Sequence, residues 1–405
     1  MSRFRRAVGA VCAGLGFATA ALAQSEGSDA QTFAEWREAF VGRAADKGYA
    51  RDRVAELLAG LTPDDRVIRL DGQQPEFIRP IWDYLDIAVS EARVADGRAR
   101  FETHRDLLTA IEVAHQVDAD ILTAIWGLES AYGAITGDFD VVRSFATLAY
   151  DGRRRAWAES ELLTILDLLS EGVLTRGDLV GGWAGAMGQT QFLPSTLAAH
   201  GVDWSGDGRI DLRGDVGDAL ASAARYLQSL GWRTGLAPAV EVALPSGFDL
   251  SLAEQTPRPL SDWIALGLAR ARAAWPHAPA PQTASLILPA GVNGPAFLLM
   301  DNFRVLRGYN NATAYALGVS LLADAIARRP GVAGVWPEGE PALTPGRVVA
   351  LQEALVALGY DPGAAAGVIG PNTRKAVRAY QRAVGLPADG FVTVKLIDQA
   401  VAAAG

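Results

Sequence analysis

The chain has 405 residues, half of them hydrophobic, and a formal net charge of −9 at pH 7. This length predicts two or three domains with enough apolar residues for a large core. The net acidity and the lack of a basic run argue against a nucleic-acid-binding protein. The sequence has one cysteine, Cys12, which excludes an internal disulfide and a cysteine-based metal site.

The first 23 residues have the pattern of a cleavable secretory signal peptide. Three arginines near the start precede the short apolar stretch Ala7–Leu22, and Ala21-Leu22-Ala23 forms a small-residue cleavage signal. Cleavage after Ala23 would also remove Cys12. No run of 18 apolar residues follows, so we expect no transmembrane anchor in the mature chain.

The spacing of apolar residues predicts a series of amphipathic helices over the first 230 residues. One opens at Arg79–Trp82, and the others are expected at Phe33–Lys47, Arg51–Leu58, Arg98–Val117, Ala119–Gly133, Val141–Tyr150, Arg155–Ser170 and Val216–Leu230. The segment Gly181–Pro194 is not periodic. Its glycines and alanines permit close packing of the backbone.

Beyond residue 230 the pattern changes twice. Three short β-prone runs, Val240–Leu244, Ala284–Leu288 and Ala296–Met300, predict a small β-containing subdomain. A helix is expected at Asn310–Arg328, followed by a linker at 329–345 that is rich in proline and glycine. Three apolar stripes in 346–405 predict a three-helix module. The predicted fold class is therefore mainly α.

Glu129 is the one charged residue on an otherwise apolar helical face. Leu122, Ile125, Trp126 and Tyr132 share that face with it at three- and four-residue spacing. Desolvation there would raise the pKa of Glu129 and keep its proton near neutral pH, as a general acid requires. The alternative is a residue at the helix edge that reaches solvent or pairs with an arginine.

An acidic loop beginning at Asp203 matches the first nine positions of an EF-hand calcium loop. Gly208 occupies the sharp-turn position, but Gly214 stands where the full motif has a bidentate glutamate, so the match is partial. Either Asp218 or Asp215 would replace that ligand. We expect a structural Ca²⁺ of modest affinity, and the alternative is an acidic surface turn. The expected ligands are Asp203, Ser205, Asp207, Arg209 (through its carbonyl), Asp211 and Asp218.

Three motifs, taken together and in this order, resemble the family B lytic murein transglycosylases. They are Trp126–Gly133 (WGLESAYG), Ala184–Ser195 (AGAMGQTQFLPS) and Arg307–Asn310 (RGYN). The resemblance covers about residues 33–328, and we place the catalytic domain at 24–328. It implies a lysozyme-like α-domain with a glycan groove, a periplasmic location and Glu129 as the sole acid/base, without a catalytic cofactor.

The resemblance also implies a set of substrate-binding residues. Flat aromatic rings suit sugar faces, amides suit acetamido groups, and arginines suit carboxylates. The alternatives are a core role for the tyrosines, backbone support by the glutamine and a solvated basic run for the arginines. The residues carried over from the family are Gln191, Tyr226, Tyr309, Asn310, Tyr315, Arg154 and Arg155.

The last 60 residues resemble the type 1 peptidoglycan-binding module. Leu358-Gly359-Tyr360, Gly367–Gly370 and Gly385–Gly390 carry this resemblance, although Ala366 stands where an aspartate is usual. The resemblance implies that this module binds cell-wall glycan strands.

An ordinary glycosidase needs two carboxylates, and no second acid stands convincingly beside Glu129. Asp138 and Asp140 follow in a loop and can equally be turn residues. The family resemblance implies non-hydrolytic cleavage of the MurNAc-β-1,4-GlcNAc bond to 1,6-anhydro ends. The alternatives are a muramidase-type hydrolase and a non-catalytic wall-binding protein. Complexes for wall synthesis or division are the expected protein partners.

Overall fold

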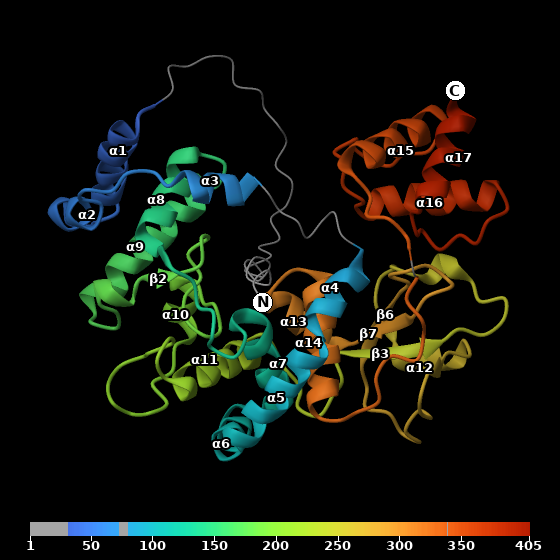
Figure 1. Ribbon diagram of the computed structural model, residues 1–405, viewed down its shortest axis with the longest axis horizontal. Coiled ribbons are helices and arrows are strands. Elements are labelled where there is room, and N and C mark those ends of the chain that lie inside the picture. The colour runs from blue at the N-terminus through green and yellow to red at the C-terminus, as the bar shows by residue number, and fades with distance from the viewer. Residues whose placement is uncertain (1–30, 73–79, 338) are drawn as a thin grey trace, which may run out of the picture. The chain divides into compact units, whose positions relative to one another are not determined.

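The computed structural model describes residues 31–72, 80–337 and 339–405 (Figure 1). The predicted signal peptide and Arg79 lie outside these residues. The described chain is mainly helical with a small antiparallel sheet, which confirms the predicted fold class. No helix in the described ranges is both long and apolar enough to cross a bilayer.

The chain divides into two compact units. The first unit contains residues up to 74, 92–234 and 309–312, and the second contains 75–91, 235–308 and 313–405. The short return at 309–312 brings the end of the third sequence motif into the first unit, together with the other two motifs.

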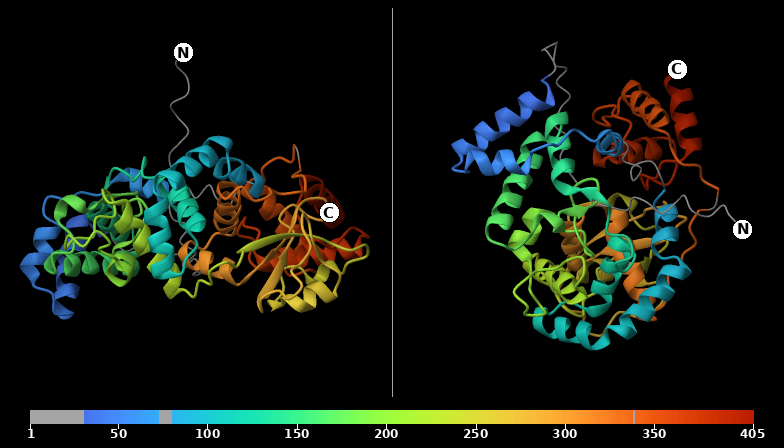
Figure 2. Two further views of the ribbon diagram at one scale, coloured as in Figure 1. Left: turned by 90° about the horizontal axis from the view of Figure 1, so that it is seen from below. Right: turned by 60° about the vertical axis from the view of Figure 1, so that its left-hand side comes forward.

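The first unit is built almost entirely from helices, which Figure 2 shows in two further views. Helix α8 packs on α9, and α6 packs on α11. Its core includes fully buried Trp36, Phe40 and Phe145. The helices are α1 (Phe33–Asp46), α2 (Arg51–Leu57), α3 (Asp65–Gly72), α5 (Glu91–Thr103), α6 (Arg105–His115), α7 (Ala119–Ser130), α8 (Val141–Asp151), α9 (Arg155–Ser170), α10 (Pro194–His200) and α11 (Val216–Ser229).

The single helix predicted for Arg98–Val117 is wrong. The chain turns at His104, which separates α5 from α6 and has φ −108° and ψ 20°. The turn sets α6 free to follow its own direction against α11 and places the His104 ring edge-on to Trp126, at 5.4 Å between centroids. Apolar periodicity alone does not report such a turn, because both helices keep an apolar face.

The second unit contains a five-stranded antiparallel sheet with the strand order β4-β6-β7-β3-β5. The three predicted β runs correspond to β3, β6 and β7, each within one residue of its predicted bounds. Burial alternates along β6, so every second side chain enters a core around Trp263. The strands are β3 (Ala239–Ala243), β4 (Arg258–Pro259), β5 (Ala269–Arg270), β6 (Thr283–Ile287) and β7 (Ala296–Leu299), and the accompanying helices are α4 (Ile81–Ala88), α12 (Leu260–Ala265), α13 (Asp301–Tyr309) and α14 (Thr313–Ile326).

The second unit ends in the predicted three-helix module, formed by α15 (Pro345–Ala357), α16 (Pro371–Ala383) and α17 (Val394–Ala404). Leu351, Val377 and Ile397, one from each helix, are buried in a common core. The segment before the module lies against the sheet region. There the Glu241 carboxylate accepts hydrogen bonds from the amides of Ala333 (2.6 Å) and Gly334 (2.7 Å).

The module is docked on the sheet region by charged side chains. Arg374 and Arg378 of α16 each lie 2.8 Å from the Glu254 carboxylate, and the Val292 amide donates to Asp389 at 3.0 Å. Glu254 has φ +58°, a left-handed conformation that is uncommon for residues other than glycine. Its backbone amide is held by the Leu286 carbonyl at 2.8 Å.

Candidate active site

Glu129 lies in the last turn of α7 and is 6% exposed. The helix ends at Ser130, earlier than its predicted end at Gly133. Ala131, Tyr132 and Gly133 then have φ values of 49°, 58° and 84°. Three consecutive left-handed residues, two of them not glycine, mark a strained turn directly after the predicted acid.

Tyr132 does not extend the face of α7 but folds back across the helix. Its ring packs so closely on Gly127 that a Cβ atom there would lie 2.6 Å from the Tyr132 hydroxyl. That hydroxyl donates to the Arg93 carbonyl at 2.8 Å, and burial raises the pKa of Tyr132. Glycine at position 127 is therefore required for this turn to close.

Two polar residues that the sequence analysis did not single out hold the end of α7. The Ser130 hydroxyl donates to the Gln189 carbonyl at 2.6 Å and accepts from the Gly133 amide at 2.9 Å. The side-chain oxygen of Gln189 accepts from the Trp126 indole at 2.8 Å. Both residues lie inside the motifs quoted above, and polar residues beside motif glycines were the available signal.

Gln191 sits in the glycine-rich loop that joins β2 (Val180–Gly181) to α10. It has φ +51° and is 8% exposed. Its side-chain amide donates to the carbonyls of Gly188 (2.8 Å) and Thr136 (3.3 Å). Thr136 belongs to the segment between Glu129 and β1 (Phe139–Asp140), so Gln191 connects the two loops that follow the first two motifs.

Tyr226 and Tyr309 meet in an aromatic cluster of the first unit. Their ring centroids are 5.4 Å apart, and both rings contact Phe192. The Tyr309 hydroxyl donates to the Thr190 carbonyl at 2.6 Å. Burial raises the pKa of Tyr309 well above its ordinary value of 10, and the charge of Glu129 adds to the increase. This electrostatic effect places Tyr309 in the field of the predicted acid.

The other residues of the third motif region divide between the two units. Asn310 belongs to the first unit and is 9% exposed; its side-chain oxygen is buried and accepts no hydrogen bond. A buried amide oxygen in this state is available to a donor on a ligand. Tyr315 lies on α14 in the second unit and is 2% exposed.

Arg154 and Arg155 are both engaged within the protein. Arg154 lies 3.2 Å from the buried carboxylate of Asp71, which also pairs with Arg153 at 2.5 Å. The Arg155 guanidinium donates to the Ala149 carbonyl at 3.1 Å. These contacts give the pair a part in the packing of α3 and α8 beside any contact with substrate.

The two acids that follow Glu129 have different surroundings. Asp140 caps α8 by accepting from the Arg143 amide at 3.1 Å, and it pairs with Arg176 at 2.5 Å. Asp138 is exposed and has no hydrogen bond or ion pair within the protein. Asp140 is thus a helix cap, while the carboxylate of Asp138 is open to solvent or ligand.

The acidic loop has the turn of an EF-hand, but its carboxylates are directed to backbone amides. Gly208 has φ +87°, and its amide donates to Asp203 at 2.8 Å. Asp218, 1% exposed, accepts from the amides of Trp204 and Asp211, both at 2.8 Å. Asp215 caps α11. Over the residues that the structure describes, no three His, Cys, Asp or Glu side chains are grouped to hold a metal.

The remaining predicted ligands lie along the same loop. The Asp207 carboxylate accepts from the Arg209 amide at 2.9 Å, and Asp211 accepts from the Gly214 amide at 2.7 Å. The Ser205 hydroxyl donates to Asp203 at 3.3 Å. The backbone fits a calcium loop better than the side chains do, and an ion would have to redirect several of these carboxylates.

Comparison with known proteins agrees with this site. Residues 32–324 match the transglycosylase SLT domain family, and residues 344–399 match a peptidoglycan binding domain family. The chain is 31% identical over 305 residues to the membrane-bound lytic murein transglycosylase B of Escherichia coli strain K12. That alignment covers 71% of this chain and 81% of the relative.

Solved structures extend the similarity over nearly the whole chain. SltB3 from Pseudomonas aeruginosa, in complex with NAG-NAM-pentapeptide, is 45% identical with a TM-score of 0.87, covering 91% of this chain and 100% of that one. The same protein with NAG-anhNAM-pentapeptide gives a TM-score of 0.86 at 45% identity, covering 91% and 99%. The Escherichia coli lytic transglycosylase Slt35 in complex with calcium gives 0.61 at 28% identity, covering 72% and 93%.

Both motif-bearing regions of the first unit fall within the matched catalytic domain, and the three-helix module falls within the second match. With a family match over most of its length and a curated relative above 30% identity, the chain belongs to the lytic transglycosylase family of enzymes.

Proposed function

We propose that this enzyme cleaves the β-1,4 bond between N-acetylmuramic acid and N-acetylglucosamine without consuming water. The observation that carries the proposal is the burial of Glu129 at the strained end of α7, beside Tyr309. The SltB3 complex with an anhydro product supports the same chemistry in a relative. The substrate of this chain is peptidoglycan.

In the proposed reaction, protonated Glu129 donates its proton to the leaving oxygen of N-acetylglucosamine. The 2-acetamido group of muramic acid stabilises the anomeric carbon as the glycosidic bond breaks. The Glu129 carboxylate then takes the proton of the C6 hydroxyl, and that oxygen bonds to C1 to form the 1,6-anhydro ring. An internal hydroxyl has a large entropic advantage over water.

The remaining predicted residues bind the glycan in this scheme. Tyr226 and Tyr309 present ring faces to sugars, and the unpaired oxygen of Asn310 accepts a hydrogen bond from an acetamido N–H or a hydroxyl group. Gln191 shapes the loop that faces the cleaved bond. Tyr315, Arg154 and Arg155 contribute from the groove wall.

End-group analysis of digested sacculi tests the reaction. The wild-type enzyme should produce 1,6-anhydromuramic acid ends, and the Glu129→Gln variant should fold normally and lose at least roughly 10²–10⁴-fold in turnover. Ordinary reducing ends would indicate a muramidase-type hydrolase instead. Near-normal turnover by Glu129→Gln would remove Glu129 from its assigned role.

We further propose an exported, periplasmic enzyme with a signal peptide at 1–23, a catalytic domain at 24–328, a linker at 329–345 and a wall-binding module at 346–405. The match of the last segment to a peptidoglycan binding domain supports its binding role. Its natural partners would then be glycan strands, together with the complexes that build or divide the wall.

A calcium ion at the acidic loop is a separate proposal. The left-handed Gly208 supports it, and so does the calcium complex of Slt35. Asp203, Ser205, Asp207, Arg209, Asp211 and Asp218 would supply the oxygen ligands. The ion would hold the loop ahead of α11, which carries Tyr226, and would perform no chemistry.

A further inference from the structure

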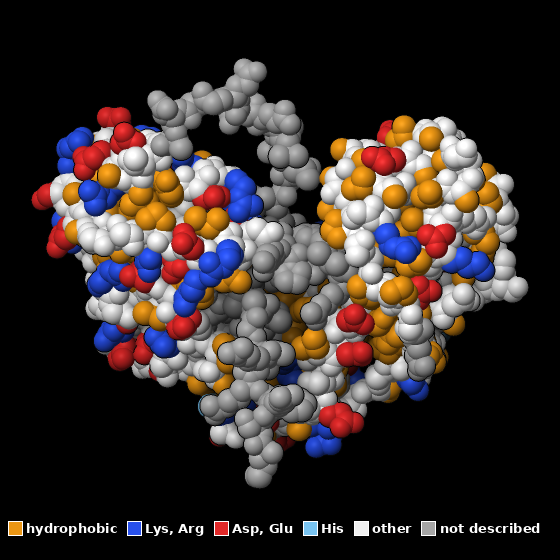
Figure 3. All heavy atoms as spheres, turned by 45° about the horizontal axis from the view of Figure 1, so that its top comes forward, with side chains coloured by type: hydrophobic (Ala, Val, Ile, Leu, Met, Phe, Trp, Pro, Cys, Tyr) orange, Lys and Arg blue, Asp and Glu red, His pale blue; other side chains and the backbone are white. Residues whose placement is uncertain are grey.

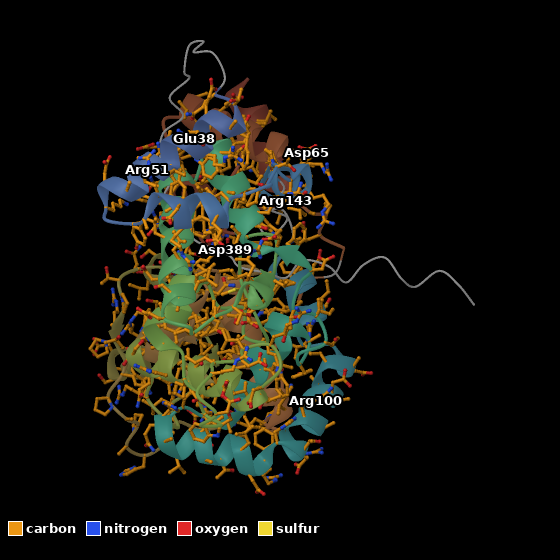
Figure 4. The ribbon with its side chains drawn as sticks, turned by 90° about the vertical axis from the view of Figure 1, so that its left-hand side faces the viewer. Glu38, Arg51, Asp65, Arg100, Arg143 and Asp389 are labelled. Carbon is orange, nitrogen blue, oxygen red and sulfur yellow. The ribbon has the colours of Figure 1, made fainter. Side chains whose placement is uncertain are left out.

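A cavity of about 430 Å³ lies in the first unit, apart from the residues assigned above. It is lined by Asp64 and Arg66 from the α3 end of the molecule, by Asp138, Phe139 and Asp140 of the loop after Glu129, and by Arg143 of α8. Figure 4 labels Arg143 on α8 and Asp65 on α3, two helices that pack together. Acidic and basic side chains alternate over the same unit, at the left of Figure 3.

Most of the charges in this cavity are used to hold its walls. Arg143 donates to the carbonyls of Thr62 and Pro63, both at 2.7 Å, and lies 3.6 Å from Asp64. Asp140 is occupied by Arg176 and by the start of α8. These contacts give the cavity a fixed frame, because each joins segments that are far apart in the sequence.

Two charged groups are left to face a ligand. Asp138 is exposed and makes no ion pair or hydrogen bond with the protein. Arg66 has a side chain that is 52% exposed; it lies 4.1 Å above the Phe139 ring and 3.8 Å from Asp64, a carboxylate that it shares with Arg143. The cavity therefore presents one carboxylate and one guanidinium, with an aromatic ring under the guanidinium.

The wall that carries Asp138 is continuous with the active site. The Ile135 amide donates to the Ser130 carbonyl at 2.9 Å, which folds this segment back on the end of α7. One residue later, the Thr136 carbonyl accepts from Gln191. A substrate held at Glu129 thus has this cavity along the same loop.

We infer that the cavity binds the free amino-acid end of a diaminopimelate residue on the peptide stem of peptidoglycan, an inference that rests on the proposed function. That end carries an ammonium and a carboxylate on one carbon. The ammonium pairs with Asp138 and the carboxylate with Arg66, whose planar guanidinium suits a carboxylate. No other part of an uncross-linked stem offers both charges so close together.

This assignment makes the site selective among stems. A lysine stem keeps the ammonium but has no carboxylate beside it. An amidated diaminopimelate stem has lost the negative charge, and a cross-linked one has lost the positive charge to an amide bond. The cavity therefore favours stems that are neither amidated nor cross-linked.

Calorimetric titration of the full-length Glu129→Gln protein tests the inference without turnover. The probes are a GlcNAc-MurNAc tetrasaccharide with no stem and the same glycan with stems ending in diaminopimelate, amidated diaminopimelate or lysine. We expect the free diaminopimelate stem to bind best. Asp138→Asn and Arg66→Met should each weaken that binding about three- to tenfold, and leave the stemless glycan unchanged.

Asp106→Asn and Arg51→Ala are matched controls, because both residues are exposed and neither lines the cavity. Equal affinity for all four glycans would overturn the inference, as would equal weakening of stemmed and stemless glycans by the cavity variants. The result is independent of the reaction type. An enzyme that leaves ordinary reducing ends but prefers the free diaminopimelate stem contradicts the proposed function alone.

Discussion

The Ser130 hydroxyl donates a 2.6 Å hydrogen bond to the Gln189 carbonyl, 59 positions further along the chain. This bond joins the residue after Glu129 to the glycine-rich loop. The same hydroxyl also accepts from the Gly133 amide, so one side chain serves both sides of the left-handed turn. The orientation of the acid therefore depends on a neighbour that never touches the reacting atoms.

We predict that Ser130→Ala destabilises the protein by about 1–3 kcal/mol, because it leaves a buried carbonyl and a buried amide without partners. Turnover should fall while KM changes little, since the loosened group is the acid and not the glycan-binding surface. Denaturant unfolding and steady-state kinetics measure the two effects. Ser160→Ala, at an exposed position of α9, is the control. An unchanged kcat would show that the turn holds Glu129 without this bond.

Glu161 predicts a pH-dependent stability. It is 4% exposed and accepts from the amide (2.9 Å) and hydroxyl (2.6 Å) of Ser195 at the start of α10. Burial raises its pKa above the ordinary 4.5, and the two hydrogen bonds only partly oppose this. The folded state therefore binds the proton more tightly than the unfolded state, and stability is lost as the pH rises from 4.5 through the raised pKa.

Unfolding of the wild type and Glu161→Gln between pH 4 and pH 7 checks this sign. The free energy of unfolding of the wild type should fall relative to that of the glutamine variant as the pH increases. A constant difference across the range would mean that Glu161 does not titrate there.

Glu254 predicts the opposite dependence. Burial alone would raise its pKa, but Arg374 and Arg378 together outweigh that effect and lower it below 4.5. Stabilisation by this carboxylate is thus complete above pH 4.5 and is lost as the pH falls through the lowered pKa. We expect Glu254→Gln to loosen the three-helix module at neutral pH, as the wild type does in acid.

Limited trypsin digestion measures this loosening through cleavage near Arg328 and Arg329. The variant should release the C-terminal fragment several times faster than the wild type. Asp398→Asn removes an exposed ion pair with Arg347 inside the module and should leave the rate unchanged. Equal rates for all three proteins would show that the ion pairs do not hold the module in place.

Deletion of residues 346–405 tests wall binding. The truncated enzyme should pellet less with insoluble sacculi but retain turnover of short soluble glycans, because attachment raises the local enzyme concentration only on a polymer. Equal pelleting with and without the module would assign wall binding to the catalytic domain.

Calcium should raise the melting temperature of the full-length protein if the acidic loop binds it. At ten times Kd the added stability is about 1.4 kcal/mol by mass action. Asp207→Ala should abolish the increase and leave activity in excess substrate mostly intact, whereas Asp106→Asn should keep the increase. Calorimetry without a shift at millimolar calcium would make the loop a plain turn.

The sequence predicted the features that repeat or that sit in long motifs. Burial of Glu129 followed from helical spacing, and the strands β3, β6 and β7 from their β-branched and apolar runs. The break at His104 was not predictable from periodicity, since it serves the packing of α6. The Ser130–Gln189 bond joins residues that only the tertiary fold brings together.

The same limit applies to the charged residues. The pairing of Arg154 with Asp71 depends on how α3 meets α8, and nothing in the order of residues along the chain indicates it. Asp138 and Asp140 look alike in sequence, and only the structure separates a helix cap from an open carboxylate.

Docking through Glu254 has a consequence for how such enzymes can be rearranged. The carboxylate comes from a strained loop beside the sheet, and its two arginines come from α16, about 120 positions away. A foreign wall-binding module spliced on after residue 345 would fold by its own core yet meet an unmatched, half-buried negative charge. The loop and the helix are therefore expected to be inherited, or transplanted, as one piece.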